Sequence, residues 1–309
     1  MPQRKIAAAG LAAVACVAVA ACSSSGGGKS GSSSNPLAPS TSSSVVVGSA
    51  NFPEDELLAQ IYADALKGAG VKVTTKLNIG AREVYYPEVT KGVISIIPEY
   101  NGALLSTSVD PKSKAASTAE VNAALKAKLP SSVEILNSAP AQDKDSITVT
   151  QATASKYHLK SISDLAPVAK NFVIGGPSEF KTRADGIVGL KKVYGLTFKS
   201  FSPLDESGPI TISALKSGKV QAADIFTTTP QIVTDKFVSL ADPKNMFAAQ
   251  NVTPLVYKKA ASAKVVSTLN AVSAKLTTEA LLQMDKALTI NHASYTQVAS
   301  GFISQEGLK

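Results

Sequence analysis

The sequence lacks most of the residues from which catalytic and metal centres are built. It has no Trp, two Cys and only two His, His158 and His292, among 309 residues. It contains no zinc-protease, hydrolase-nucleophile, P-loop or dinucleotide-binding motif. Acid pairs such as Asp205 with Glu206 are better explained as solvated loop charges than as a general acid and base. We therefore expect a protein that is not an enzyme and that holds no metal and no other cofactor.

Charge of one sign is also not concentrated anywhere. The formal net charge is +8, but no run of five or more Lys and Arg occurs, so a nucleic-acid partner is not predicted. Hydrophobic residues make up 44% and charged residues 17%, which is an ordinary globular composition. The length allows two domains or one large α/β unit.

The N-terminus has the layout of an export signal. A basic start, "MPQRK", precedes the apolar segment "IAAAGLAAVACVAVAA", which is short for a membrane span. Residues 1–21 are therefore a predicted signal peptide, and "VAAC" resembles the bacterial lipobox, in which Cys22 becomes the lipidated first residue. A plain signal peptide with a chance Cys is the alternative. The Ser/Gly-rich residues 22–43 predict a flexible tether, and loss of Cys16 with the signal leaves no disulfide pair.

The rest of the chain alternates predicted strands and helices. From residue 44 the order is β-α-β-α-β with short links, which predicts a parallel sheet covered on both faces. A second α/β set follows, and three helices close the chain. Predicted strands lie at about 44–50, 71–80, 93–100, 133–136, 146–150, 171–176, 197–204, 220–226, 237–242 and 251–257. Predicted helices lie at about 51–70, 81–92, 118–130, 186–195, 209–218, 261–276, 277–290 and 294–307.

Two element ends carry local predictions. Asn51 is expected to cap the first helix, with Glu54 completing a capping box. In "IPEYNGA", Pro98 is expected to end the third strand and Glu99 to brace the loop that follows. Ligands of open α/β sheets sit beyond strand ends, so Tyr100 is expected to face a cleft.

Several segments together resemble one family. They include "VVVGSANFPEDELLAQIYADALKGAG", "GVISIIPEYNGALL", "GGPSEFKTRADGIVGLKKVYGLTFKSF" and "ISALKSGKVQAADIFTT". In this order they resemble the substrate-binding proteins of ABC importers for osmoprotectants (the ProX/OpuAC type), from about Val45 to the C-terminus. The resemblance implies an α/β, type II periplasmic-binding fold of two lobes joined by a two-segment hinge. Lobe 1 would hold residues 45–146 and 251–309, and lobe 2 residues 147–250.

The resemblance also implies a role and a location. The chain would be a monomeric solute-binding lipoprotein that captures a molecule of the glycine betaine or choline type between its lobes. It would deliver this ligand to the permease and ATPase subunits of an ABC importer. A lipid on Cys22 would hold it on the extracytoplasmic face of the bacterial cell membrane.

The family's ligand site is matched only in part. Family members hold a quaternary ammonium group in a cage of tyrosines and a carboxylate on an arginine. Tyr100 matches the first cage tyrosine, Phe226 replaces another, and Arg183 in "FKTRADG" matches the arginine. Two further cage positions fall on Asp145 and Ile212.

The departures leave the ligand open. Ala103 in "PEYNGA" stands where the family often has Thr, and two rings of the cage are missing. Asp145 would pair either with a cationic ligand or with Arg183. Thr228 would add a neutral hydrogen-bonding group, and Asn51 and Phe52 follow the first strand at a ligand-proximal place. The alternative function is therefore the same receptor fold with a neutral polar or phenolic ligand.

Overall fold

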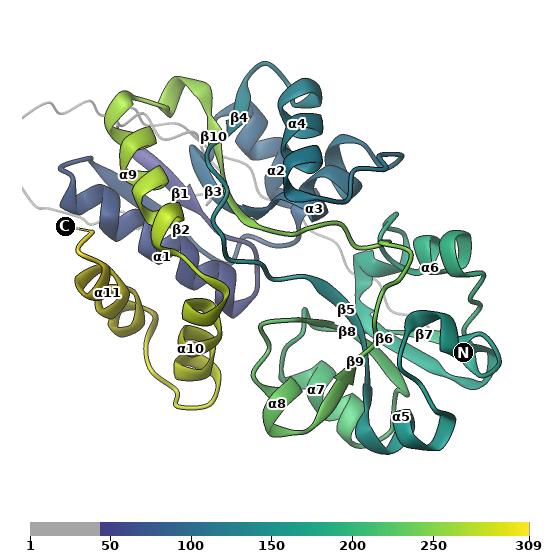
Figure 1. The fold of residues 1–309 in the computed structure, drawn as a ribbon. Helices are drawn as coiled ribbons and strands as arrows, with labels where there is room; N and C mark the ends of the chain where they lie inside the picture. Colours follow the sequence, from purple (N-terminus) through teal and green to yellow (C-terminus); the bar gives the residue numbers. More distant parts are fainter. Residues whose placement is uncertain (1–43, 309) are drawn as a thin grey trace, which may run out of the picture. The chain divides into compact units, whose positions relative to one another are not determined.

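The structure is a computed structural model that describes residues 44–308, and it has two α/β lobes, each built on a mixed five-stranded sheet (Figure 1). The predicted signal peptide, the tether and the lipidation site Cys22 lie outside the described residues. Within residues 44–308, no helix is both long and apolar enough to cross a membrane.

The sheet of lobe 1 has the strand order β2-β1-β3-β10-β4. Its strands are β1 (Val45–Gly48), β2 (Val73–Lys76), β3 (Ile96–Tyr100), β4 (Val133–Ile135) and β10 (Val252–Tyr257). Strand β1 runs parallel to β2 and β3, whereas β10 is antiparallel to β3 and β4. The helices of this lobe are α1 (Pro53–Gly68), α2 (Arg82–Lys91), α3 (Asn101–Leu104), α4 (Thr118–Lys128), α9 (Ala263–Lys275), α10 (Thr278–Thr289) and α11 (Tyr295–Glu306).

The sheet of lobe 2 repeats this arrangement with the order β7-β6-β8-β5-β9. Its strands are β5 (Asp145–Thr150), β6 (Val173–Pro177), β7 (Ser200–Leu204), β8 (Ala222–Phe226) and β9 (Phe237–Ser239). Its helices are α5 (Gln151–Tyr157), α6 (Ile187–Tyr194), α7 (Pro209–Lys216) and α8 (Gln231–Thr234). In each sheet the fourth strand, β10 or β5, is antiparallel to its neighbours and is the strand that the chain enters after crossing from the other lobe.

The predicted α/β architecture is confirmed. The first five elements form β1-α1-β2-α2-β3 with three parallel strands, and each sheet contains one antiparallel strand, β10 or β5, so neither sheet is purely parallel. The two crossings between the sheets are the two-segment hinge. The boundaries at 146/147 and 250/251 stay predictions, although β5 already begins at Asp145.

Helix α1 carries the apolar spacing that the sequence predicts. Leu57, Leu58, Ile61, Tyr62 and Leu66 are all fully buried. The helix packs against β1 and β3 on one side and against the three C-terminal helices on the other. Because each buried apolar side chain contributes about 1.5–3 kcal/mol, this packing fixes the N-terminal turn of α1 firmly at the interlobe side of its sheet.

The predicted cap of α1 is wrong. The N-cap residue is Phe52, no side chain caps the helix, and Pro53 occupies the first turn. Asn51 is exposed. Instead, the carboxylate of Asp55 accepts a hydrogen bond from the N–H of Ala50 at 2.5 Å. A proline after Phe52 already satisfies the geometry of a helix start, since it needs no N–H partner.

Pro98 does not end its strand. It lies inside β3, opposite Pro254 of β10. Neither proline has a backbone N–H to donate. Because the two face each other, the missing hydrogen-bond donors fall at one position of the β3–β10 pair, and β3 continues to Tyr100. Directly after the strand, a Cβ added to Gly102 would lie 2.3 Å from the carbonyl oxygen of Ala249. The glycine therefore lets the crossing segment before β10 pack closely on α3.

Candidate functional site

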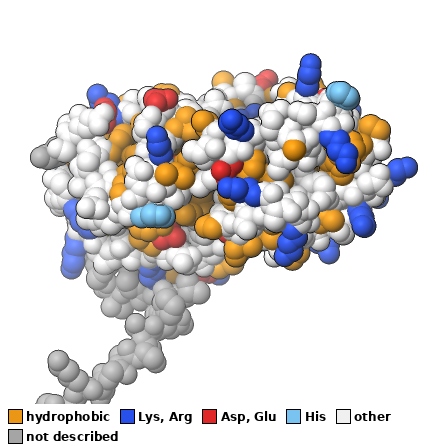
Figure 2. Space-filling model, turned by 90° about the horizontal axis from the view of Figure 1, so that it is seen from below, with side chains coloured by type: hydrophobic (Ala, Val, Ile, Leu, Met, Phe, Trp, Pro, Cys, Tyr) orange, Lys and Arg blue, Asp and Glu red, His pale blue; other side chains and the backbone are white. Residues whose placement is uncertain are grey.

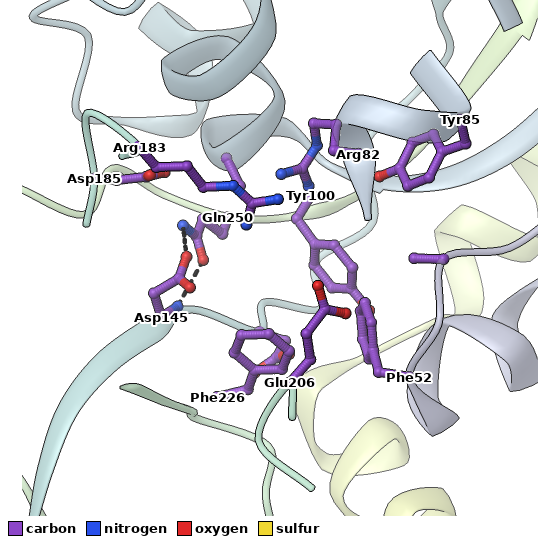
Figure 3. A pocket seen from close by; sticks show the side chains of 13 residues that line it. Phe52, Arg82, Tyr85, Tyr100, Asp145, Arg183, Asp185, Glu206, Phe226 and Gln250 are labelled. Carbon is purple, nitrogen blue, oxygen red and sulfur yellow. Dashed lines mark hydrogen bonds between the residues drawn. The ribbon is translucent and has the colours of Figure 1, made fainter. Parts of the chain in front are cut away.

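A cavity of ≈ 40 Å³ is lined by residues of both lobes, which is space for about three water molecules. Its lining residues come from the segments after β1 and β3, the start of α2, the two crossings, and the loops of lobe 2. They are Ala50, Phe52, Arg82, Tyr85, Tyr100, Ala103, Asp143, Asp145, Arg183, Asp185, Glu206, Phe226 and Gln250 (Figure 3). Tyr100 and Phe226 end their strands, so the site lies beyond strand ends, as expected for such sheets.

Three aromatic rings form one wall of this cavity. The ring centroids of Phe52 and Tyr100 are 5.8 Å apart, and those of Phe52 and Phe226 are 5.2 Å apart. Phe52 and Tyr100 belong to lobe 1, and Phe226 belongs to lobe 2. Ring faces attract cations, so rings at these distances can surround a positively charged group with their faces.

Behind the rings, Glu54 joins the two lobes. The hydroxyl of Tyr100 donates to Glu54 Oε1 at 2.5 Å, and the hydroxyl of Thr228 donates to Glu54 Oε2 at 2.7 Å. Thr228 in turn donates its backbone N–H to Asp143 Oδ1 at 3.0 Å. Burial, and then the nearby carboxylate of Asp285, raises the pKa of Glu54 well above its usual range.

Arg82 is held by a fully buried carboxylate. Its Nη2 and Nε donate to Glu99 at 2.9–3.1 Å, and the Tyr85 hydroxyl donates to the same carboxylate at 2.8 Å. Burial alone would lower the pKa of Arg82, but the charge of Glu99 outweighs it, and the pKa is raised. Glu99 also accepts the N–H of Tyr100 at 3.1 Å. The predicted bracing role of Glu99 is therefore confirmed, and its main partner is α2.

Arg183 reaches from lobe 2 to a carboxylate of lobe 1. Its Nε and Nη2 donate to Glu83 at 3.0 and 2.9 Å. Nη1 has no hydrogen-bond partner within residues 44–308. The two guanidinium groups, of Arg82 and Arg183, extend toward the same side of the cavity (Figure 3). This side can therefore receive a carboxylate group.

Asp145 pairs with Gln250, not with Arg183. Gln250 Nε2 donates to Asp145 Oδ2 at 2.6 Å, and the N–H of Asp145 donates to Gln250 Oε1 at 2.7 Å (Figure 3). Since each residue lies on one of the two crossings, this pair ties the crossings together. Beside it, Asp185 Oδ2 accepts the hydroxyl of Ser106 in lobe 1 at 2.6 Å.

Carboxyl groups outnumber arginines around the cavity. The lining contains four acids against two arginines, and each arginine already binds a glutamate, Glu99 or Glu83. Burial raises the pKa of Asp185 to about 6 and that of Glu206 to about 7. One oxygen of each of these two acids is buried with no hydrogen-bond partner among the described residues. These two oxygens can therefore accept hydrogen bonds from a ligand that brings N–H or O–H donors.

The structure brings most predicted site residues together. Tyr100, Phe226, Phe52, Asp145 and Arg183 all line the cavity. Three other positions lie elsewhere. Thr228, which is buried, and Ile212 of α7 line a wider groove, and Asn51 is exposed and lines neither space.

Sequence reasoning did not nominate Arg82, Asp185, Glu206 and Gln250, which also line the cavity. Asp185 carries the one available signal, because it stands two residues after Arg183 in "FKTRADG". The other three lie in segments whose sequence has no distinguishing pattern.

Beyond the rings, the cavity borders a wider groove between the loops of lobe 2 and the α10–α11 segment. The groove shares Phe52, Asp143, Glu206 and Phe226 with the cavity. On the face shown in Figure 2, hydrophobic side chains gather around a central hollow, with lysine and arginine side chains spread around them. Among residues 44–308, no group of three or more His, Cys, Asp or Glu side chains is arranged so that it could hold a metal ion.

The chain is similar to known binding proteins over most of its length. The model of the family described as the substrate-binding domain of ABC-type glycine betaine transport systems matches residues 43–305. The glycine betaine-binding protein YehZ of Escherichia coli (strain K12) is 26% identical over 279 residues, covering 86% of this chain and 92% of YehZ.

Two solved structures share the fold. A crystal structure of a glycine betaine/carnitine/choline ABC transporter protein has a TM-score of 0.65 at 22% identity, covering 85% of this chain and 99% of that one. Lactococcal OpuAC, closed around glycine betaine, has a TM-score of 0.59 at 17% identity, covering 85% and 96%. With the family model matching most of its length, the chain belongs to the OpuAC family of substrate-binding proteins of ABC-type glycine betaine transport.

Proposed function

We propose that this protein is an extracytoplasmic receptor, anchored by a lipid on Cys22, that delivers an osmoprotectant-like zwitterion or cation to its permease. The observation that carries the proposal is the composition of one interlobe cavity. Phe52, Tyr100 and Phe226 supply aromatic rings for a cation, and Arg183 supplies a guanidinium for a carboxylate.

The lobes support capture by closure. Side chains of lobe 2 bind side chains of lobe 1 on several sides of the cavity, as in the pairs Arg183–Glu83, Asp185–Ser106 and Thr228–Glu54. Two crossings connect the sheets, so a hinge motion is the simplest way to open this small space to a ligand. Closure would then complete the aromatic wall, because Phe226 comes from the second lobe.

A second candidate is a neutral polar or phenolic ligand in the same cavity. The observation that favours it is the loss of cage positions: Asp145 binds Gln250, and Ile212 does not reach the cavity. Three rings remain, and a flat aromatic ligand would stack on them as a cation would lie over them.

Thermal unfolding of the purified domain, residues 44–309, with candidate ligands tests the proposal. Glycine betaine, choline, carnitine and proline betaine form one set, and neutral phenols and polyols form the other. A ligand present at 100 times its Kd should stabilise the domain by about 2.7 kcal/mol. Stabilisation by the first set supports the osmoprotectant role, stabilisation by phenols alone supports the second candidate, and stabilisation by neither refutes a receptor for these compounds.

A further inference from the structure

Among the residues that line the cavity, Glu206 has the least expected orientation. It belongs to the short loop between β7 and α7, yet its side chain turns into the interlobe space. Figure 3 shows its carboxylate extending toward Tyr100, with the rings of Phe52 and Phe226 nearby. A loop acid would ordinarily point to water, because desolvation of a charge is costly.

The flanking residues force this orientation. Ser207 has φ 56°, in the left-handed region that non-glycine residues rarely adopt. Its hydroxyl accepts the N–H of Phe226 at 3.0 Å and lies 2.8 Å from the Thr229 hydroxyl. On the other flank, Asp205 accepts the N–H of Thr211 at 2.8 Å, at the start of α7. The loop is fixed on both sides of Glu206, and a strained residue held by its surroundings is a frequent mark of a functional site.

Glu206 also lacks what a structural carboxylate normally has. Its Oε2 is buried and has no hydrogen-bond donor within the described chain. Neither arginine of the cavity forms an ion pair with it. Asp185, only 4% exposed, presents a second unpartnered oxygen in the same lining. A buried acceptor without a hydrogen bond destabilises the folded state. A ligand that donates hydrogen bonds to these oxygens would remove this cost.

The cavity therefore has two chemically different ends. The guanidinium groups of Arg82 and Arg183 lie on one side, and the aromatic rings with Glu206 lie on the other (Figure 3). A zwitterion would place its carboxylate at the arginines and its ammonium group among the rings. A fully methylated ammonium has no N–H, so it would leave Glu206 Oε2 without a donor.

We infer that Glu206 is the cation-binding carboxylate of this site and that the ligand's ammonium group carries an N–H that donates to it. This inference rests on the proposed receptor function and narrows its ligand class to incompletely methylated amino-acid zwitterions. Glu206 would thereby bind the ammonium group in place of the two aromatic rings that the site lacks.

The matched probes are N,N-dimethylglycine, which has one N–H, and glycine betaine, which has none. We would measure both dissociation constants by isothermal titration calorimetry at pH 8 for the wild type, Glu206→Gln and Glu206→Asp. Glu134→Gln, on β4 and outside the cavity lining, removes one negative charge elsewhere and is the control. The melting temperature of each variant without ligand reports its folding.

We expect the wild type to bind dimethylglycine at least tenfold more tightly than glycine betaine. Glu206→Gln should remove this preference, Glu206→Asp should reduce it, and Glu134→Gln should keep it. A wild type that binds glycine betaine as tightly as dimethylglycine, or a preference that survives in Glu206→Gln, overturns the inference and leaves the receptor function standing. If no member of the whole panel, including phenols and polyols, binds the wild type, the receptor function and the inference both fail.

Discussion

Tyr100 and Thr228, from different lobes, donate to the two oxygens of the same buried carboxylate. The distances to Glu54 are 2.5 Å and 2.7 Å. Tyr100 lines the interlobe cavity with its ring, and Thr228 belongs to lobe 2. Closure of the lobes and placement of the ring are therefore coupled through Glu54.

Replacing Thr228 with Val should weaken ligand binding while keeping the volume of the side chain. The change leaves an acceptor of Glu54 unpaired only in the closed form, at a cost of about 1–2 kcal/mol. Affinity for whichever panel compound binds should therefore fall about 5- to 30-fold, measured by calorimetry. Thr74→Val, at an exposed position of β2, is the control and should leave the Kd unchanged. An unaltered Kd in Thr228→Val would show that this contact does not favour closure.

The order of elements was predictable because each carries its own local pattern. Helix α1 has its buried residues at helical spacing, and the strands are β-branched runs bounded by turn residues. The family resemblance supplied the two-lobe fold. What local pattern could not supply was which carboxylate each arginine binds, since Arg183 and Glu83 are 100 residues apart.

The errors at Asn51 and Pro98 have the same origin. Both predictions relied on the usual local preference of one residue type, Asn as a helix cap and Pro as a strand end. At Pro98 a residue distant in sequence, Pro254, determines the strand pairing instead. The interpretation of Glu206 as a solvated loop charge is wrong for a related reason, because its side chain lines the cavity and its Oε2 is buried. Its loop has the composition of any solvated turn, and only the contacts of Ser207 with Phe226 and Thr229 show where it points.

Glu99→Gln should strongly destabilise the fold. Glu99 is fully buried and Arg82 nearly so, and together they form a bidentate pair. Removing one charge of a buried pair leaves the other uncompensated, which costs about 3–5 kcal/mol. Urea unfolding measures this change. Asp64→Asn, which breaks the exposed pair with Lys67, should cost less than about 1 kcal/mol. Equal effects of the two variants would contradict the importance of the buried pair.

Stability of the ligand-free domain should fall as the pH rises from 5 to 8. Burial raises the pKa of Asp285 to about 7, whereas in the unfolded chain an aspartate titrates near 3.9. The folded state therefore holds the proton more tightly in this window, and stability declines through it by up to about 1.4 kcal/mol per pH unit for each such group. The raised pKa values of Asp185 and Glu206 act in the same direction.

Asp285→Asn should flatten this pH dependence, because the amide does not titrate. The unfolding free energy, measured at several pH values, should exceed that of the wild type most clearly at pH 8. Glu279→Gln, exposed on the same helix α10, should follow the wild-type curve. A wild-type stability that increases from pH 5 to pH 8 would contradict the assignment of these buried acids.

Lipidation at Cys22 predicts where the full chain resides in a bacterial host. Cys22→Ser removes the residue that would carry the lipid, so the protein should leave the membrane fraction and lose the mass of the lipid. Cys16→Ser changes a Cys within the predicted signal peptide and should keep both. Cell fractionation and intact-protein mass spectrometry report the two properties. Membrane retention of Cys22→Ser together with an unmodified wild-type mass would rule out this anchor.

The affinity for a cationic ligand should depend on pH through Glu206. Burial raises the pKa of this carboxyl to about 7, with Glu179 contributing, against the opposing charges of Arg183 and Arg82. In the free protein it is therefore about one-tenth ionised at pH 6 and about nine-tenths ionised at pH 8. Only the ionised form attracts an ammonium group, so the Kd for dimethylglycine should fall about tenfold over this range.

Glu206→Gln should remove most of that slope, because the glutamine cannot ionise and only acids such as Asp185, with a pKa of about 6, still titrate nearby. Titration calorimetry at pH 6, 7 and 8 in buffers of different ionisation enthalpy also counts the protons released on binding. The wild type should release close to one proton near pH 6, and Glu206→Gln should release far fewer. Equal proton release by both proteins would mean that the cation is neutralised elsewhere in the cavity, with Asp185 as the next carboxylate to change.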